Sequence, residues 1–175
     1  HTRLQGDWSS DVCSSDLRDA AAALAWVGKN ASKLGVDVTK IHAGGGSAGG
    51  HLASMTPFAT ELLATEQSIH AIQKLVLFNP AVNFAHAEGL GSNPEMLQNL
   101  GMSLEAFLAI DPYPRLSADY PETLIFHGTA DKIVPVGAIT AFTKQARGLG
   151  ADVTLVEFEG RDHGFFNLRV SQTDF

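Results

Sequence analysis

The sequence predicts an α/β fold built on a mostly parallel β-sheet. Short apolar runs that suit buried strands alternate with segments whose apolar residues recur every three or four positions. Strands separated by helices pair in parallel, because each helix returns the chain to the end at which the previous strand began. With 175 residues, of which 45% are hydrophobic and 18% charged, the chain is long enough for one domain with a core.

The first predicted element is a helix over residues 18–34. Its apolar residues share one helical face: Ala20, Leu24, Val27, Ala31 and Leu34. Gly35 is the expected stop, because glycine adopts the left-handed conformation that closes many helices. Residues 40–43 form a short predicted strand that runs into a glycine cluster. A second helix begins at Ala48, and Pro57 should end or kink it.

Two compact apolar runs, residues 74–78 and 123–127, indicate the next buried strands. Between them, residues 84–121 carry Gly, Pro and Asn punctuation and one helical patch at 104–110, so we expect an insertion over a pocket. The remaining predicted elements are a helix over 136–149, a strand over 153–158 and a loop over 160–167.

Residues 7–17 stand apart from the rest, because they show neither helical nor alternating apolar periodicity. They resemble the translation of a common short-read sequencing adapter, so we interpret residues 1–17 as a non-native segment, as expected for a metagenomic fragment. The alternative is a genuine Ser/Asp-rich tail. Cys13 is the only cysteine and cannot form an internal disulfide, which leaves a cytoplasmic and a secreted bacterial location both open.

The charge balance narrows the class of partner. A net charge of −7 and a pI near 5.4 argue against nucleic acid and anionic membrane surfaces, which need clustered Lys and Arg. No stretch approaches the roughly 20 apolar residues that span a bilayer. We therefore expect a small-molecule ligand and no nucleic-acid or membrane partner, and the sequence does not indicate the oligomeric state.

The most informative motif is Gly45-Gly-Ser-Ala-Gly49, placed between a predicted strand and a predicted helix. A serine at such a turn is raised clear of the sheet, so the Ser47 hydroxyl can act as a nucleophile. We expect side chains at Gly45 and Gly49 to collide with the adjoining elements. The N–H of Ala48 is the candidate oxyanion-hole donor. A phosphate-binding loop is the alternative, but neither the Walker nor the dinucleotide spacing is met.

A nucleophilic serine needs a histidine base that is oriented by a carboxylate. Asp131 and His163 each follow a predicted strand, and loops after parallel strands converge on one edge of the sheet. The order Ser47, Asp131, His163 is the order that α/β-hydrolases use. Asp162 and Asp152 compete for the role of the acid. Asp162 adjoins the histidine in sequence, and Asp152 lies before its strand, at the wrong edge.

The other histidines favour structural interpretations. We expect His127 to be a packed turn residue at a strand end and not a second base. His51, one helical turn beyond Ser47, can line the pocket, although packing is favoured. The rest show no metal-ligand spacing, so we predict no metal and no cofactor: His42, His70 and His86.

These residues carry a resemblance to a known family. Residues 18–167 resemble bacterial α/β-hydrolases of the acetyl-esterase and hormone-sensitive-lipase-like group, which includes acetylxylan and feruloyl esterases. The most specific segments are 19–27, 45–53, 124–131 and 162–167. The resemblance implies a three-layer α/β-hydrolase fold of which this chain is the C-terminal half, strands five to eight. It also implies a serine esterase that cleaves short-chain, acetyl-type carboxylic esters, in some relatives on a carbohydrate.

The resemblance also implies parts that this chain lacks. Relatives carry opening strands and a His-Gly-Gly type loop upstream of the first helix, and a final helix beyond Phe175. The strand before Ser47 would then have an open apolar edge, and oxyanion donors would be missing. We therefore expect the full-length parent to be an active esterase, and the 175-residue chain to be weakly active or inactive.

Other functions remain open at this stage. Prolyl-oligopeptidase-like peptidases and arylformamidases share the fold and the triad order, but such peptidases often carry an aromatic residue where this chain has Ala48. A non-catalytic hydrolase-like binding module is the remaining alternative. The presence of all three triad residues argues against it.

Overall fold

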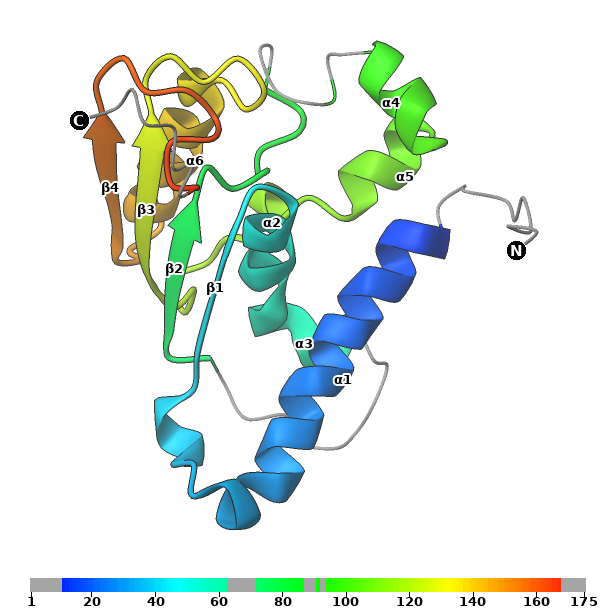
Figure 1. Ribbon diagram of the computed structural model, residues 1–175, viewed down its shortest axis with the longest axis vertical. Helices are drawn as coiled ribbons and strands as arrows, with labels where there is room; N and C mark the ends of the chain where they lie inside the picture. The colour runs from blue at the N-terminus through cyan, green and yellow to red at the C-terminus, as the bar shows by residue number, and fades with distance from the viewer. Residues whose placement is uncertain (1–10, 63–71, 87–90, 92–93, 168–175) are drawn as a thin grey trace.

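The computed structural model describes residues 11–62, 72–86, 91 and 94–167. Its centre is a four-stranded sheet in the order β1-β2-β3-β4, with every neighbouring pair parallel (Figure 1). The strands are β1 (His42–Gly46), β2 (Lys74–Phe78), β3 (Glu122–Gly128) and β4 (Val153–Phe158). The predicted parallel α/β fold is confirmed.

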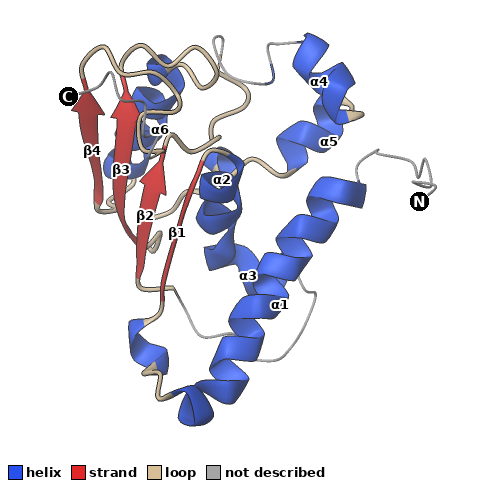
Figure 2. Ribbon diagram, viewed as in Figure 1, coloured by secondary structure: helices blue, strands red, loops and turns tan. Residues whose placement is uncertain are grey.

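The helices alternate with the strands along the chain (Figure 2). The α-helices are α1 (Asp11–Leu34), α2 (Ala48–Met55), α3 (Ala59–Leu62), α4 (Pro94–Leu100), α5 (Leu104–Ala109) and α6 (Val136–Gly148). Short 3-10 helices are η1 (Val38–Lys40), η2 (Thr56–Phe58) and η4 (Tyr113–Arg115). Within the described part of the chain, none of the helices has the length and apolarity needed to cross a membrane.

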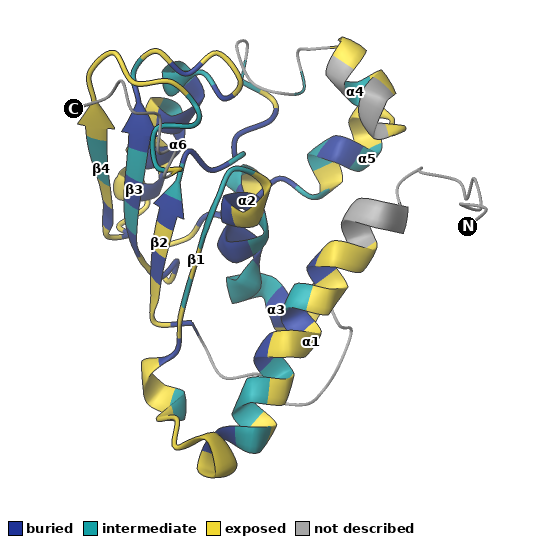
Figure 3. Cartoon of the chain, in the orientation of Figure 1, coloured by how far each residue is buried: buried dark blue, intermediate teal, exposed yellow. Residues whose placement is uncertain are grey.

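One face of the sheet is covered by α2 and α6 and forms the core. The strand register places Leu77 opposite Ile125, and Ile125 opposite Leu155, so these residues point to the same face. Leu77 and Ile125 are fully buried and belong to one hydrophobic cluster with Ile139 and Phe142 of α6. Figure 3 shows buried segments along β2, β3 and α6. Helix α1 packs on α2 and α3 and forms the outer part of this layer.

The other face of the sheet carries aromatic side chains. Phe78 of β2 stacks on Phe126 of β3, with ring centroids 5.0 Å apart. Two aromatic residues that follow β4 close over this face: Phe166 lies 5.4 Å from Phe78, and Phe165 lies 4.7 Å from Phe158. These ring contacts fix the segment after β4 against the sheet, and that segment contains His163.

Helix α1 begins seven residues before the predicted start. The prediction began at residue 18, whereas the helix starts at Asp11. Leu17 explains the difference, because it is 2% exposed and lies one turn before the buried Ala21. A single leucine extends the apolar stripe without creating a periodic pattern of its own. The end of the helix agrees with the prediction, since Gly35 has φ +68°.

Strand β1 begins two residues later and ends three residues later than predicted. Lys40 belongs to η1, and the strand runs through the glycines to Gly46. A Cβ added at Gly44 would lie 2.7 Å from the backbone oxygen of Val76, so this strand approaches β2 too closely for a side chain. Apolar patterning cannot locate such a strand, because its pairing is made by bare backbone.

A buried carboxylate, that of Asp111, joins the chain after β2 to the segment that precedes β3. Asp111 is 2% exposed and accepts backbone N–H groups from Asn83 (2.9 Å), Phe84 (2.6 Å) and Tyr113 (3.0 Å). Burial raises the pKa of Asp111, and the three N–H donors oppose that rise. The Phe84 ring also stacks on Phe107 at 4.1 Å. The helical patch at 104–110 is confirmed as α5, whereas α4 was not predicted; the insertion itself stays a prediction.

Burial predicts a large difference between two leucines. Leu77→Ala removes a side chain that is 0% exposed and should lower the free energy of unfolding by about 2–5 kcal/mol, because it leaves a cavity in the core. Leu149→Ala truncates a side chain that is 42% exposed and should cost about 0.5 kcal/mol. Urea unfolding of the complete gene product measures both. Equal costs would contradict the described core.

Candidate active site

Ser47 occupies the sharp turn between β1 and α2. Its backbone lies at φ +55° and ψ −120°, a conformation that is strained for a residue with a side chain. Hydrogen bonds hold the turn in place: the Ser47 N–H donates to the Phe78 carbonyl at 2.9 Å, and the Ser47 carbonyl accepts from the N–H of His51 at 3.0 Å. Ala48 follows as the first residue of α2, where backbone N–H groups have no acceptor within the helix.

The glycines around Ser47 are required to different degrees. A Cβ at Gly45 would lie 2.5 Å from the backbone of Gly49, and one at Gly46 would lie 2.5 Å from the Phe166 ring. Nothing lies within 4 Å of a Cβ added at Gly49. The expected collision at Gly45 is confirmed, whereas the one at Gly49 is wrong. The reason is that a Cβ at Gly49 would point into open space. It is the backbone of Gly49 that leaves no room for a Cβ at Gly45.

The three sequence-predicted residues lie in one hydrogen-bonded chain. His163 Nε2 lies 2.7 Å from Ser47 Oγ, and His163 Nδ1 lies 2.8 Å from Asp131 Oδ2. An ionised carboxylate has no hydrogen to donate, so in the bond to Asp131 the hydrogen lies on His163 Nδ1. His163 Nε2 then has a free lone pair and accepts from the serine hydroxyl. The arrangement can take a proton from Ser47 and return it.

The Asp131 carboxylate is oriented by backbone donors. Its side chain is 0% exposed, and Oδ1 accepts the N–H groups of Ile133 and Val134, both at 2.9 Å. Oδ2 is therefore the oxygen that remains for His163, whose side chain is 22% exposed. A buried carboxylate with three donors is a fixed, compensated charge.

His127 is packed beneath this carboxylate and does not act as a second base. It is 0% exposed, and its Nε2 lies 2.9 Å from the Val134 carbonyl oxygen. Burial lowers the pKa of His127, more than the bond to Val134 and the nearby Asp131 charge raise it. The neutral ring therefore donates to Val134 and supports the loop that carries Asp131. His127 lies within β3 and not in a turn, which corrects one detail of the prediction.

His51 also has a structural position. It is 8% exposed, its Nδ1 lies 3.1 Å from the Ala81 carbonyl oxygen, and its ring lies 5.1 Å from that of Phe84. Burial lowers the pKa of His51 to about 4, so the ring is neutral and Nδ1 donates to Ala81. Packing between α2 and the segment after β2 accounts for this residue.

The competing residues lie away from the histidine ring. The Asp162 carboxylate accepts from the Gly164 N–H at 3.0 Å, within its own turn. Asp152 is exposed and precedes β4, at the end of the sheet opposite to Ser47. His42 is exposed at the start of β1. His70 lies outside the described residues, and among the described ones no cluster of three or more His, Cys, Asp or Glu side chains is placed to hold a metal ion.

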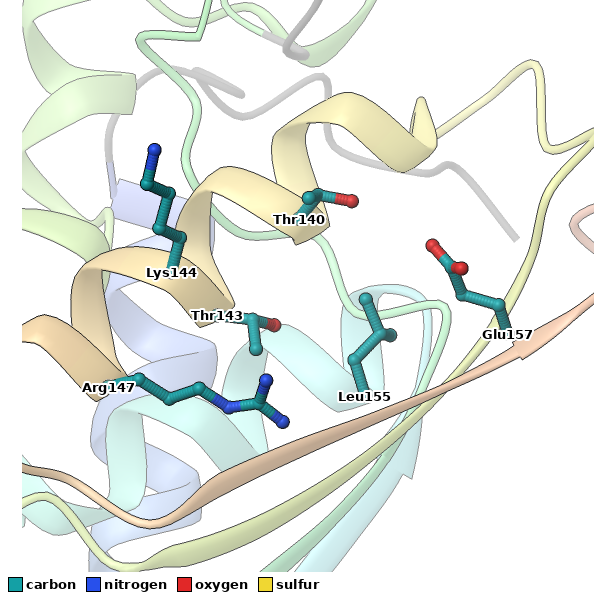
Figure 4. A pocket seen from close by; sticks show the side chains of 6 residues that line it. All are labelled: Thr140, Thr143, Lys144, Arg147, Leu155 and Glu157. Carbon is teal, nitrogen blue, oxygen red and sulfur yellow. The ribbon is translucent and has the colours of Figure 1, made fainter.

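A separate groove of about 400 Å³ lies between α6 and β4 (Figure 4). Its lining residues are Thr140, Thr143, Lys144, Arg147, Leu155 and Glu157. None of the three triad residues lines it. The groove therefore lies outside the candidate active site.

Sequence reasoning did not single out Asn79. This residue directly follows the strand at 74–78, and its side-chain Nδ2 lies 2.7 Å from the His163 carbonyl oxygen. The signal available was the pair Asn79-Pro80 directly after a buried strand, at the edge of the sheet where Asp131 and His163 were expected.

Comparison with known proteins assigns the family. The BD-FAE family model matches residues 8–145, which include Ser47 and Asp131 and end before His163. This chain belongs to the BD-FAE family. The resemblance to α/β-hydrolase serine esterases is thereby confirmed.

Two curated relatives of this BD-FAE chain are esterases of Mycobacterium tuberculosis. The probable carboxylic ester hydrolase LipM is 30% identical over 161 residues, which cover 84% of this chain and 37% of the relative. Esterase LipC is 26% identical over 177 residues, which cover 90% of this chain and 42% of the relative. The chain thus spans about two fifths of the length of these relatives.

Solved structures of esterase 2 from Thermogutta terrifontis share the fold. The apo form is 40% identical with a TM-score of 0.73, and the match covers 87% of this chain and 56% of that chain. The form phosphonylated by sarin is 36% identical with a TM-score of 0.74, covering 89% and 59%. The BD-FAE chain therefore has the α/β-hydrolase fold.

The structure leaves no room for a side chain at Gly128, so a substitution that adds one methyl group there should disturb the site. A Cβ at Gly128 would overlap the Arg161 carbonyl oxygen, in the loop that leads to His163. Gly128→Ala should therefore lower the free energy of unfolding by about 1–3 kcal/mol, and it should also lower the rate of reaction at Ser47. Gly148→Ala is the control, because nothing lies within 4 Å of its added Cβ, and it should be neutral or up to about 1 kcal/mol more stable.

The lowered pKa of the buried His51 ring should make the stability of the fold depend on pH. Its folded-state pKa of about 4 lies below the ordinary 6.5, so on acidification the unfolded state binds a proton that the folded state does not. Stability is full above about pH 6.5 and falls towards pH 4, by about 2 kcal/mol between pH 6.5 and pH 5. His51→Asn should flatten this slope in urea unfolding, and His42→Asn, at an exposed position, should not. An unchanged slope in H51N would contradict a neutral, buried ring.

Proposed function

We propose that the protein hydrolyses short-chain carboxylic esters through an acyl-enzyme on Ser47. The observation that carries the proposal is the hydrogen-bonded chain from Ser47 Oγ through His163 to Asp131 Oδ2, with distances of 2.7 and 2.8 Å. Membership of the BD-FAE family and similarity to named esterases support the same chemistry. Because the chain spans only part of its relatives, the activity is assigned to the complete gene product.

In the first half of the reaction, Ser47 Oγ attacks the ester carbonyl carbon and His163 Nε2 takes the hydroxyl proton. The oxygen of the tetrahedral intermediate gains negative charge, which the N–H of Ala48 at the start of α2 stabilises. Asp131 holds the resulting imidazolium through Nδ1–H. The bond to the leaving alcohol then breaks, and His163 gives that alcohol the proton.

In the second half, water attacks the acyl carbon of the Ser47 ester. His163 takes a proton from this water, the acyl bond to Oγ breaks, and the proton returns to Ser47 as the carboxylic acid leaves. Ester plus water thus gives acid plus alcohol, with the protein unchanged. The chain's own groups supply the nucleophile, the base and one oxyanion donor.

The proposed substrate is an ester with a short acyl group. Forms of Thermogutta terrifontis esterase 2 with propionate and with butyrate bound are 38% and 37% identical to this chain. The form phosphonylated by sarin supports a reactive nucleophile in a related site. We therefore propose esters with acetate- to butyrate-sized acyl groups, with acetylated carbohydrates as one natural class of ester.

The carboxylates offer a matched test of the triad. Asp131→Asn should lower kcat for p-nitrophenyl acetate about 10⁴-fold, because the amide no longer holds the productive histidine tautomer. Asp152→Asn, at the far end of the sheet, should stay within about twofold of wild type, as expected for a surface change. Equal losses in D131N and D152N would exclude Asp131 as the acid.

A comparison of an ester with an amide tests the class of substrate. Hydrolysis should be faster with p-nitrophenyl acetate than with the corresponding anilide. Preference for the anilide would favour an amidase or peptidase.

A further inference from the structure

One dipeptide at the end of β2 contacts the main chain of two triad residues. The Phe78 carbonyl accepts the N–H of Ser47 at 2.9 Å. The next side chain, Asn79, donates from Nδ2 to the carbonyl of His163 at 2.7 Å. The backbone segment that fixes the nucleophile therefore also fixes the base.

The hydrogen bond from Asn79 is the main-chain anchor of His163. Among the described residues, no other hydrogen bond reaches the backbone of His163. The ring is held by Asp131 and Ser47, but these contacts orient an imidazole whose starting point is set by its Cα. Without Asn79, the His163 ring could keep its bond to Asp131 while Nε2 moves away from Ser47.

Asn79 is itself rigid. It is 0% exposed, and its own N–H donates to the Phe126 carbonyl of β3 at 2.9 Å. Its φ of +42° lies in the left-handed region, which asparagine tolerates better than most residues. The anchor is therefore part of the sheet edge and not of a loose loop.

The amide chemistry points to a donor role. Nδ2 carries two hydrogens and faces two carbonyl oxygens, that of His163 and, at 3.5 Å, that of Asp162. The other amide atom, Oδ1, is buried and has no donor among the described residues. Among the described residues, the polar contacts of this side chain are therefore those that Nδ2 makes with these two carbonyls.

We propose that Asn79 is a positioning residue that sets the distance between Ser47 and His163 by fixing the main chain of His163. This inference rests on the proposed esterase function, because its effect is measured through the reactivity of Ser47. Removal of the donor should act on kcat and not on substrate binding, since Asn79 reaches the reacting atoms only through His163.

Asn83 provides a matched control for this test. It is also a buried asparagine, 3% exposed, with a left-handed φ of +56°. Its Nδ2 likewise donates to a backbone carbonyl, that of Ala138 at 3.2 Å, but Ala138 belongs to α6 and not to the triad. Substitution of Asn79 or Asn83 by alanine removes a hydrogen bond from a side-chain amide to a backbone carbonyl in each case. Only the Asn79 substitution releases the main chain of a triad residue.

The experiment compares Asn79→Ala with Asn83→Ala in the complete gene product. With p-nitrophenyl acetate, N79A should lose about 10- to 100-fold in kcat with KM within about threefold, as expected when a reacting group is displaced by a fraction of an ångström. N83A should keep kcat within about threefold of wild type, and thermal unfolding should show that both are folded. Equal loss of kcat in both variants, or a loss confined to KM, would overturn the proposal.

Asn79→Asp adds a readout that a purely structural role would not produce. A protonated carboxyl at position 79 can donate to the His163 carbonyl, whereas an ionised one cannot, and burial favours the protonated form. The ratio of N79D to wild-type kcat should therefore rise as the pH is lowered from about 8 to about 5. The ratio for Asn83→Asp should stay flat. If N79A does not fold, this pair decides the question, and a flat ratio for N79D would overturn the proposal.

Labelling by a fluorophosphonate separates failure of this inference from failure of the proposed function. If the wild-type protein labels at Ser47 but does not cleave acetate esters, the proposed substrate is wrong. The labelling rates of the same variants then test Asn79, with the same 10- to 100-fold difference expected. If the wild-type protein neither labels nor cleaves esters, the proposed function and this inference both fail.

Discussion

The backbone conformation of Ser47 is the constraint on which the rest of the site depends. A residue with a side chain at φ +55° and ψ −120° is strained by about 1–3 kcal/mol, and the surrounding structure must hold it there. The means are visible in the turn: Gly45 clears the backbone of Gly49, and Gly46 leaves room for the Phe166 ring. Side chains at either position would displace the serine or the loop that carries its base.

The sheet then brings the other two groups to the same edge. Ser47 and His163 are 116 positions apart in sequence, and Asp131 and His163 are 32 apart, yet each pair is within hydrogen-bond distance. All three follow the carboxyl ends of parallel strands, so the fold converts distance in sequence into proximity in space. The buried Asp131 carboxylate is compensated by two backbone N–H groups and one ring N–H, and the neutral His127 beneath it adds no competing positive charge.

The features that the sequence predicts well are those with a regular pattern or a specific motif. Strands β2 and β4 have the predicted bounds, because both are short segments rich in apolar residues, with Asn79 directly after β2 and Gly160 two residues after β4. The residues Ser47, Asp131 and His163 could be selected because each is a reactive side chain in the turn or loop that follows a strand. The prediction for strand β1 was two residues early at its start and three at its end, because the pairing is made by glycine backbone, which carries no apolar signal. The buried Asp111 was missed because its partners Asn83 and Phe84 lie 28 and 27 residues away in sequence. Asn79 was missed for the same reason, since its partner lies 84 residues away.

Identification of the residue that a fluorophosphonate modifies tests this account most directly. The complete gene product is treated with the probe, digested, and its peptides mapped by mass spectrometry. The account predicts one modified residue, Ser47, and loss of labelling in His163→Ala, because the hydroxyl reacts only when Nε2 can take its proton. Modification of another residue, or equal labelling of Ser47 without His163, would contradict the proposed catalytic role of this hydrogen-bonded chain.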